Sequence, residues 1–525
     1  MVPDKPLLAA CYMFTSLLLA LTQGLGMNFI STNVLQIQGS LGATTVEASW
    51  LTAAYMAPNV SLALLLIKIR TQFGLRRFAE IGILMFIPVA AMHLFINDLQ
   101  SAVVVRFFSG IAASPLSSLA FLYMLEAFSA PKRLTLGLGL AMLNLNLAMP
   151  LARIMSPDLL DIGLSQQLYL VEIGLAAICF ALVYLLPLTS PPRAKVIEQM
   201  DIVSYGLIAI GFGLTAIVLS VGRYYWWMEV PWLGWMLVVA VLALTAVVII
   251  ELHRANPLVD IRWLASREVM TFAVTILLIR LLLSIQNVGT TGFFQVVNIS
   301  NEQTIDLYLV VLVVTMAVGL SCAFLLKPGR TAYFHMAALA CLTLGAGLES
   351  QATNLTRPQD IYLSQGLIAA SLALFLPPTM MAGMTHAVAR GLKYILSFFV
   401  VFLTTQSLGS LLGSAIFGTF VTVREKFHSH QLVEQILLTD PIVAGRVARL
   451  GNAYGQVLTD PALVKAEGLA TLAQQVTREA TILAYNDAYH LIAVIAILTL
   501  AALIAHRFLR HLEQELYPNT SEANG

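Results

Sequence analysis

Charged residues are scarce in this chain of 525 residues. Only 11% of the residues are charged and 58% are hydrophobic, whereas a soluble domain carries about 25% charged residues. This composition excludes a soluble globular protein and predicts an all-α polytopic membrane protein. The 29 basic and 28 acidic residues nearly balance, so the composition indicates no nucleic-acid partner.

Cysteines and catalytic motifs are also scarce. The four cysteines all lie in apolar runs (Cys11, Cys179, Cys322 and Cys341), which is typical of small buried residues and not of disulfides or metal ligands. The motifs H-E-x-x-H, G-x-S-x-G and G-x-x-x-x-G-K are absent, so metal, nucleophile and nucleotide chemistry lack a signal. We therefore expect no metal, no cofactor, no enzymatic activity and no ATP-driven transport.

Long apolar runs recur along the chain. A helix needs about 20 apolar residues to cross a bilayer. On this criterion we predict fourteen spans: 8–30, 46–67, 78–96, 102–125, 134–153, 167–187, 202–221, 232–252, 270–296, 306–326, 332–352, 361–385, 394–423 and 486–506. The first run lacks a basic n-region and a small-residue cleavage site, so we expect a span and not a cleaved signal peptide.

The basic residues predict the orientation of the chain. With a cytoplasmic N-terminus, eighteen Lys and Arg residues fall on the cytoplasmic side and three in the short loops on the other side (Arg153, Arg223 and Arg357). Because cytoplasmic loops carry the excess of Lys and Arg, we expect both termini in the cytoplasm.

Two polar segments divide the spans. A Pro-containing linker begins at residue 189, and an insertion of about sixty residues, 424–485, is helical between two T-D-P breaks. We predict three parts: a six-helix bundle at 1–188, the linker with two additional spans at 189–267, and a second six-helix bundle at 268–525 that carries the insertion.

Several motifs resemble a known family. "VRFFSGIAASPL" (105–116) fits an R-x-x-Q-G pattern through Arg106 and Gly110, and "ELHRANPLVDIRWLASREV" (251–269) fits a Glu…Asn-Pro-hydrophobic-hydrophobic-Asp loop. The chain thus resembles the fourteen-span drug:proton antiporter branch of the major facilitator superfamily, of the EmrB/QacA type. The resemblance implies a major facilitator fold, with two six-helix bundles and two extra helices, and a secondary transporter in the bacterial inner (plasma) membrane.

The chain departs from that family pattern at three places. In "MNFISTNV" (27–34), Asn28 stands at the family's acidic position, while Asn33 is retained. The loop "IKIRTQFGLRR" (67–77) keeps its glycine and two arginines (Gly74, Arg76 and Arg77) but has Thr and Gln at the Asp-Arg pair. The glycine-rich fifth-span motif is absent, and Pro150 and Asn144 break the regularity of that span instead. A proline bends a helix, so we interpret the fifth span either as a kinked cavity wall or as a packing adjustment.

Two arginines lie inside apolar segments, where a charge costs several kcal/mol. Arg106 is either a strut that bonds to backbone carbonyls or a cavity residue that couples protonation or substrate binding to movement, and the resemblance favours the cavity. Arg280 has three apolar residues on each side, and its spacing to Asn287 and Gln295 places all three near one helical face. We interpret this stripe as a wet cavity wall, with an ion pair of Arg280 as the alternative.

Glu172 lies inside the sixth span. An uncompensated carboxylate there can carry a proton at neutral pH. The alternative is a structural acid paired with Arg153, which we place just outside the membrane. The two interpretations have equal weight.

The leading functional prediction is a proton-coupled exporter of amphipathic, anionic organic compounds. The missing first-span acid and the two membrane arginines favour an anion. EmrB-type proteins work with a periplasmic membrane-fusion adaptor and an outer-membrane channel, and segment 424–485 resembles the surface that meets such an adaptor. The alternatives are a cationic multidrug:proton antiporter that acts alone, and a non-transporting sensor or scaffold with the same fold.

Overall fold

The computed structural model describes residues 6–129, 132–160, 166–189, 193–327, 329–391 and 393–516. The regular secondary structure of these ranges is helical, without a strand. In chain order the helices are α1 (Pro6–Thr32), α2 (Val34–Ser40), α3 (Thr45–Phe73), α4 (Leu75–Met92), η1 (His93–Phe95), α5 (Leu99–Glu126), η2 (Arg133–Gly137), α7 (Leu138–Leu159), α8 (Gln166–Leu185), α9 (Gln199–Tyr225), α10 (Pro231–His253), α11 (Ile261–Leu264), α12 (Arg267–Leu283), α13 (Ile285–Val296), η3 (Glu302–Thr304), α14 (Ile305–Leu325), α15 (Thr331–Glu349), η4 (Pro358–Ile361), α16 (Tyr362–Arg390), α17 (Lys393–Glu434), α18 (Pro441–Asn452) and α19 (Pro461–Leu516).

The prediction of an all-helical membrane protein is confirmed. Within the described ranges, fourteen helical segments are long and apolar enough to cross a membrane, and each overlaps one predicted span. One span combines α12 and α13, which are interrupted at Ser284, where Oγ donates to the carbonyl of Leu281 at 2.7 Å.

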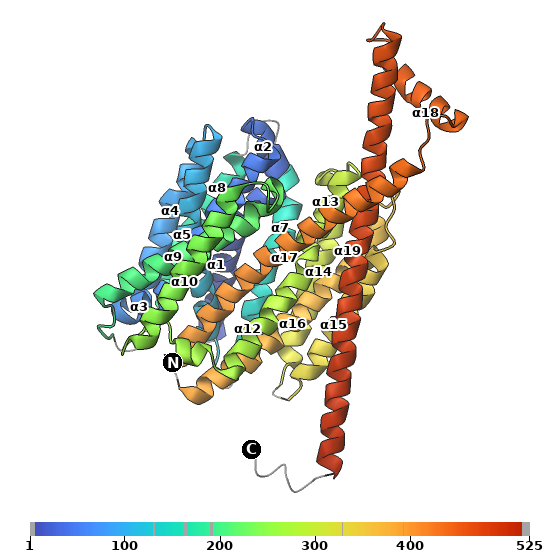
Figure 1. Cartoon of the computed structure of the whole chain (residues 1–525). Helices are drawn as coiled ribbons and strands as arrows, with labels where there is room; N and C mark the ends of the chain where they lie inside the picture. Colours follow the sequence, from blue (N-terminus) through green and yellow to red (C-terminus); the bar gives the residue numbers. More distant parts are fainter. Residues whose placement is uncertain are drawn as a thin grey trace.

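Two groups of helices form the bundle, which we call the N-half (α1–α8) and the C-half (α12–α19) (Figure 1). The chain turns sharply between α3 and α4 at Gly74, whose φ of 87° favours glycine. At Gly110 a Cβ would collide with the carbonyl oxygen of Tyr55, so α5 approaches the backbone of α3 closely. Gly110 and Gly74 therefore position the helices of the N-half.

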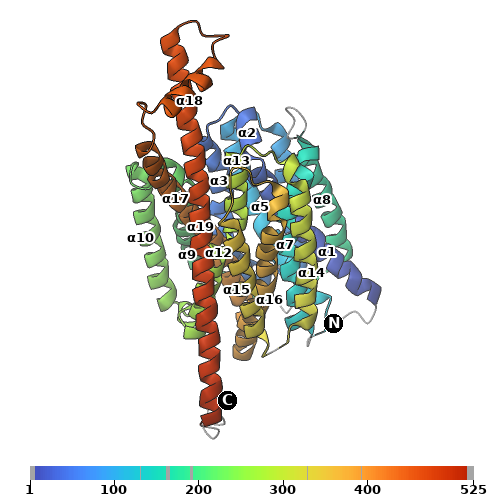
Figure 2. The same ribbon diagram turned by 90° about the vertical axis from the view of Figure 1, so that its right-hand side faces the viewer.

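The additional helices α9 and α10 lie at the edge of the bundle (Figures 1 and 2). Helix α9 packs along α3 of the N-half and also against α17 of the C-half, while α10 packs chiefly on α9. At the outer end of α9, Trp227 Nε1 donates to Thr419 Oγ1 of α17 at 2.8 Å. These contacts join the additional helices to both halves. The boundaries of the three parts stay predictions.

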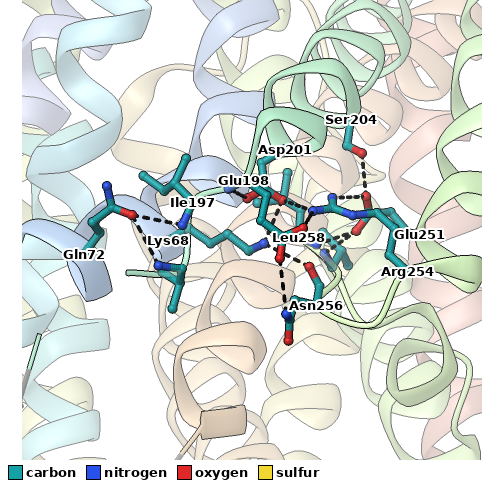
Figure 3. Close-up of polar contacts among 12 residues, drawn as sticks. Lys68, Gln72, Ile197, Glu198, Asp201, Ser204, Glu251, Arg254, Asn256 and Leu258 are labelled. Carbon is teal, nitrogen blue, oxygen red and sulfur yellow. Dashed lines mark hydrogen bonds and ion pairs between the residues drawn. The ribbon is translucent and has the colours of Figure 1, made fainter. Parts of the chain in front are cut away.

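A set of charges, buried except for Glu198, fastens α9 and α10 to α3. We call Lys68, Glu198, Asp201, Glu251 and Arg254 the inner charge cluster (Figure 3). Lys68 Nζ and Arg254 Nη2 lie 2.7 and 2.8 Å from Asp201 Oδ1. Arg254 also contacts Glu198 and Glu251, at 2.9 Å each.

The charge cluster and the neighbouring Gln72 account for two motifs of the sequence. The hydrogen bond from Arg254 holds the pKa of Glu198 below its ordinary value. Glu251 accepts the backbone N–H groups of Leu258 and Val259 from the loop that follows α10. At the position where the family pattern has an arginine, Gln72 accepts the N–H of Ile197 at 2.9 Å and so bonds to the linker. Both motif loops therefore hold the additional helices against the N-half.

The insertion continues two spans as long helices and adds α18. Helix α17 runs on to Glu434 and α19 begins at Pro461, so both extend beyond the bundle at the end that carries α18 (Figures 1 and 2). Helix α18 packs on α19 where a Cβ on Gly451 or Gly468 would collide with the opposite backbone. We call this end of the molecule the insertion side. The first turn of α1 and the last turn of α19 lie toward the opposite end, which we call the inner side.

Candidate functional site

A central cavity of about 190 Å³ lies between the two halves. Helices α1, α3, α5 and α7 form one wall, and α12, α13, α14, α16 and α17 form the other. Its polar lining residues are Gln23, Asn28, Asn59, Ser114, Ser117, Asn146, Arg280, Ser284, Gln286, Thr315, Thr404, Gln406, Ser407 and Ser410. Residues from the middle of helices in both halves therefore line the cavity.

Arg280 carries the charge of this cavity. It is the one charged residue among the described lining residues, which include no Asp or Glu. Within the described part of the chain it has no ion pair, and its Nε has no hydrogen-bond partner. The alternative of an intramolecular ion pair is therefore not what the structure shows.

Glycines of α17 bring Arg280 to the cavity. A Cβ on Gly409 would lie 2.9 Å from Arg280 Cβ, and one on Gly413 would lie 2.6 Å from Ser284 Oγ. Helix α12 therefore lies against the backbone of α17, and residues of both helices line the same wall.

The amides of the cavity supply neutral donors and acceptors. Asn28 Nδ2 donates to the carbonyl of Gly24 at 2.7 Å, one turn earlier in α1. Gln286 Nε2 and Gln406 Oε1 are buried without a hydrogen-bond partner in the described structure. Buried polar groups are normally paired, so these two amides and Arg280 are available to a bound molecule.

The fifth span contributes Asn146 where the sequence interpretation chose Asn144. Asn144 is buried and its Nδ2 donates to Ser16 Oγ of α1 at 3.3 Å. Asn146, two residues on, lines the cavity together with Pro150. Two residues along a helix are separated by about 200°, so only one of these asparagines faces the cavity.

The ninth span departs from the predicted polar stripe. Gln286 faces the cavity beside Arg280, but Gln295 is exposed and does not line it. The core face of α13 is apolar and includes Ile285, Phe293 and Phe294, so Gln295 lies elsewhere on the helix. The side chain of Asn287 falls outside the described residues.

Polar contacts join the two halves on the insertion side of the cavity. Asn33 Oδ1 accepts from Asn301 Nδ2 of the C-half at 3.1 Å, while its own Nδ2 donates to Ser156 Oγ at 2.8 Å. Arg153 Nη2 donates to Thr291 Oγ1 of α13 at 2.7 Å. Asn33 is therefore a bridging residue between the halves and does not line the cavity.

The expected location of Arg153 was wrong. It lies within α7 and is buried, with its guanidinium 5.3 Å from the ring of Tyr308. The fifth span continues to Leu159, which is longer than predicted, so this arginine is part of the helix. Its hydrogen bond goes to Thr291 and not to Glu172.

An apolar cluster joins the halves on the inner side of the cavity. Phe121, Met124 and Met142 of the N-half belong to one buried cluster with residues of the C-half, Phe272, Ile276, Met380, Met384, Phe398 and Phe402. The central cavity therefore lies between a polar contact layer on the insertion side and an apolar layer on the inner side.

Arg106 lies away from the central cavity. Its Nη1 donates to the carbonyl of Gly26 at 3.0 Å, its Nε donates to that of Leu51 at 3.4 Å, and its guanidinium lies 4.4 Å from the ring of Tyr55. These contacts are those of the strut alternative, which the resemblance had not favoured. Arg106 is buried and joins α5 to α1 and α3.

Glu172 lies behind the same strut. Its side chain is 4% exposed, and a Cβ on Gly26 would collide with its Oε1. Since Arg106 bonds to the carbonyl of Gly26, the carboxylate and the guanidinium meet at one residue of α1. The buried acid and the buried arginine of the N-half are therefore neighbours.

The two retained arginines of the motif at 67–77 have separate surroundings. Arg76 Nε lies 2.8 Å from Glu80 Oε1, one turn further along α4, and Arg77 is exposed. Sequence reasoning missed Asn301 and Gln406, which lie in or near spans but belong to no quoted motif. Both stand among other polar residues in the sequence, so no local signal singled them out.

Comparison with known proteins gives relatives of low identity. No protein-family model matches the chain. The chain is 25% identical over 240 residues to the multidrug export protein EmrB of Haemophilus influenzae, an alignment that covers 44% of this chain and 45% of that protein. It is 22% identical over 521 residues to Escherichia coli EmrB, with 95% and 96% coverage. The first alignment thus spans less than half of its relative, and the second nearly all.

The fold also occurs in solved structures. The crystal structure of the human organic anion transporter MFSD10 superposes with a TM-score of 0.52 at 12% identity, covering 94% of this chain and 97% of that one. At this identity the likeness concerns the arrangement of helices.

Proposed function

We propose that this chain, which is similar to EmrB-type multidrug export proteins and shares the fold of solved transporters, is a secondary active exporter of amphipathic organic anions. The observation that carries the proposal is Arg280, a cation without an ion-pair partner in a central cavity whose described lining has no carboxylate. A buried uncompensated charge costs several kcal/mol, and a bound anion offsets that cost.

The lining also supports an amphipathic substrate. Gln286 offers an unpartnered amide beside the guanidinium, and the apolar part of the wall includes Leu145, Met149, Leu283 and Leu372. The wall thus combines polar groups with apolar side chains, as an amphipathic substrate requires. A cationic substrate would meet Arg280 without any lining acid, which argues against the cationic alternative.

Alternating access follows from the two contact layers. Opening toward the insertion side requires the bonds Asn33–Asn301 and Arg153–Thr291 to break, and opening toward the inner side requires the apolar cluster around Phe272 to separate. Rocking of the two halves about the cavity exchanges one layer for the other. We place the inner side and both termini in the cytoplasm of a bacterium and the insertion in the periplasm.

We assign the coupling proton to Glu172, a buried membrane carboxylate beside Arg106. Replacement by glutamine keeps the shape of the side chain and removes the titration. Glu172→Gln should lose uptake driven by a proton gradient and keep exchange of labelled for unlabelled substrate in proteoliposomes. Gradient-driven uptake by this variant at the wild-type rate would refute the assignment.

The insertion supports a periplasmic adaptor and an outer-membrane channel as partners. Its helices project from the bundle and expose apolar side chains at Val433, Leu437, Ile442, Val457 and Leu463. Replacing residues 435–460 with a short Gly-Ser linker should leave transport in vesicles intact and abolish export across the whole envelope. Unchanged export by this variant would exclude the adaptor.

The test of the substrate class uses a matched pair of probes. In inverted vesicles with a proton gradient we expect uptake of a dansylated alkyl carboxylate and little uptake of the dansylated alkylamine of equal length. Arg280→Ala should lower carboxylate uptake about ten- to hundredfold, the range of a lost charged hydrogen bond, and Arg280→Lys should retain part of it.

The control is Arg193→Ala, which removes an exposed arginine in the linker and should leave uptake unchanged. Preferential uptake of the amine would favour the cationic antiporter. Uptake of neither probe, nor of a wider set of anionic amphiphiles, would favour the sensor or scaffold.

A further inference from the structure

A second cavity lies in the N-half, at its insertion side. It has a volume of about 170 Å³, and α1, α2, α3, α5 and α8 contribute to its wall. No residue of its described lining also lines the central cavity. Its polar lining residues are Ser40, His93, Asn97, Arg106, Gln166 and Tyr169, so the described lining holds one permanent cation and no carboxylate.

The guanidinium of Arg106 has donors to spare. Its two hydrogen bonds within the described structure use Nε and Nη1, and both acceptors are backbone carbonyls. The ring of Tyr55 covers one face. Carbonyl dipoles and a ring face attract a cation, but neither neutralises it. Since the hydrogen bonds use only Nε and Nη1, Nη2 remains available to a molecule in the cavity.

The surrounding charges are few and can be named. Glu172 lies beside Gly26 and is not among the described lining residues of the cavity. Asp98 caps α5 outside the lining, and its hydrogen bonds with Ser101 hold its pKa below the ordinary value. The ring of His93 stacks on Tyr169 with centroids 4.8 Å apart. Helix α8 begins at Gln166, and the N-terminal end of a helix favours an anion.

We propose that this second cavity binds a small monovalent anion, with Arg106 as its cation and Asn97 and Gln166 as neutral donors. Its volume exceeds the roughly 30 Å³ that one water molecule occupies in the liquid, so a halide with water, or a short carboxylate, fits. The site is separate from the central cavity and does not depend on the proposed export function.

The position of Glu172 makes the site responsive to charge. The carboxylate and the bound anion both draw on the same guanidinium. Neutralising Glu172 therefore leaves Arg106 with the anion as its remaining counter-charge. For two charges several ångströms apart in a protein, this competition is worth at least about 1.4 kcal/mol, or tenfold in affinity.

The test measures binding of radiolabelled chloride to the purified full-length protein in gluconate buffer at constant ionic strength. We expect saturable binding to the wild type, with displacement by bromide if the site takes halides and by acetate if it also takes carboxylates. Glu172→Gln should lower the dissociation constant about tenfold. Arg106→Gln should abolish binding.

Two further variants keep the test decisive. Asn97→Asp changes an exposed side chain at the cavity, so it should fold normally, and its added negative charge should weaken chloride binding at least about tenfold. Arg280→Gln alters the central cavity and should leave chloride binding unchanged while it impairs export. Absence of saturable chloride binding to the wild type, full binding by Asn97→Asp, or loss of binding in Arg280→Gln would each overturn the proposal.

Discussion

Lys68 Nζ lies 2.7 Å from the carboxylate of Asp201, although 133 positions separate the two residues in the sequence. The contact joins a helix of the N-half to the first of the two additional helices. Arg254, at the end of the second additional helix, contacts the same carboxylate oxygen. One buried acid thus unites three helices.

The first prediction concerns this pair. Asp201→Asn should destabilise the protein by about 3–5 kcal/mol, because it leaves the buried Lys68 without an ion-pair partner. Lys68→Met should cost less, because Arg254 still contacts Asp201. The double variant should cost less than the two single changes added together. Unfolding of purified protein in detergent measures this coupling, and additive effects would contradict a direct interaction.

The second prediction concerns acid. Because Arg254 lowers the pKa of Glu198 in the folded protein from its ordinary 4.5, the bond contributes stability above that value and loses it as the pH falls through the lowered pKa. At pH values below about 4.5, the melting temperature of the wild type should therefore decrease. Glu198→Gln should show a smaller decrease over the same pH range. An identical acid dependence in both proteins would contradict this account.

The third prediction concerns Arg106. Arg106→Ala leaves the buried carbonyls of Gly26 and Leu51 without their donor, at about 1–3 kcal/mol each, so the variant should melt at a lower temperature than the wild type. Arg106→Lys should recover part of the loss, since its ammonium can reach one carbonyl. An alanine variant with unchanged melting temperature would exclude the strut.

The fourth prediction concerns packing between α3 and α5. Gly110→Ala places a Cβ against the carbonyl of Tyr55 and 2.9 Å from Pro58 Cγ, and such overpacking costs about 1–3 kcal/mol or prevents folding. The matched control is Gly174→Ala, because a Cβ there meets no atom within 4 Å. Equal melting temperatures for both variants would show that the helices separate freely.

The spans were predictable because the bilayer constrains composition directly. A helix that crosses it must be apolar over about 20 residues, and each predicted span has its helix. The ends were less predictable, since polar residues are tolerated where they face protein. Arg153 was placed in a loop because the predicted apolar span ends there, although α7 continues past it and buries it against Tyr308.

The candidate site was predictable only in part. Arg280 and Asn28 were chosen from the sequence and line the cavity. Asn144 was chosen because it lies in a stretch that breaks helix regularity, and a helical period extended the stripe to Gln295, but neither residue lines the cavity. Which face of a helix meets a cavity depends on its neighbours, such as the glycines of α17 beside Arg280. The partners of Lys68 come from distant helix ends, and no local pattern connects them.

Helix α19 has a mechanical consequence. Its 56 residues make a rod about 84 Å long at 1.5 Å per residue, against a hydrocarbon core about 30 Å thick. Its one proline stands at the first position, so no internal proline hinge interrupts it. A small tilt of its membrane segment, which packs on α15 and α17, therefore becomes a larger sweep at the tip beside α18. The helix therefore transmits a change in the angle of the C-half to a partner bound at its far end.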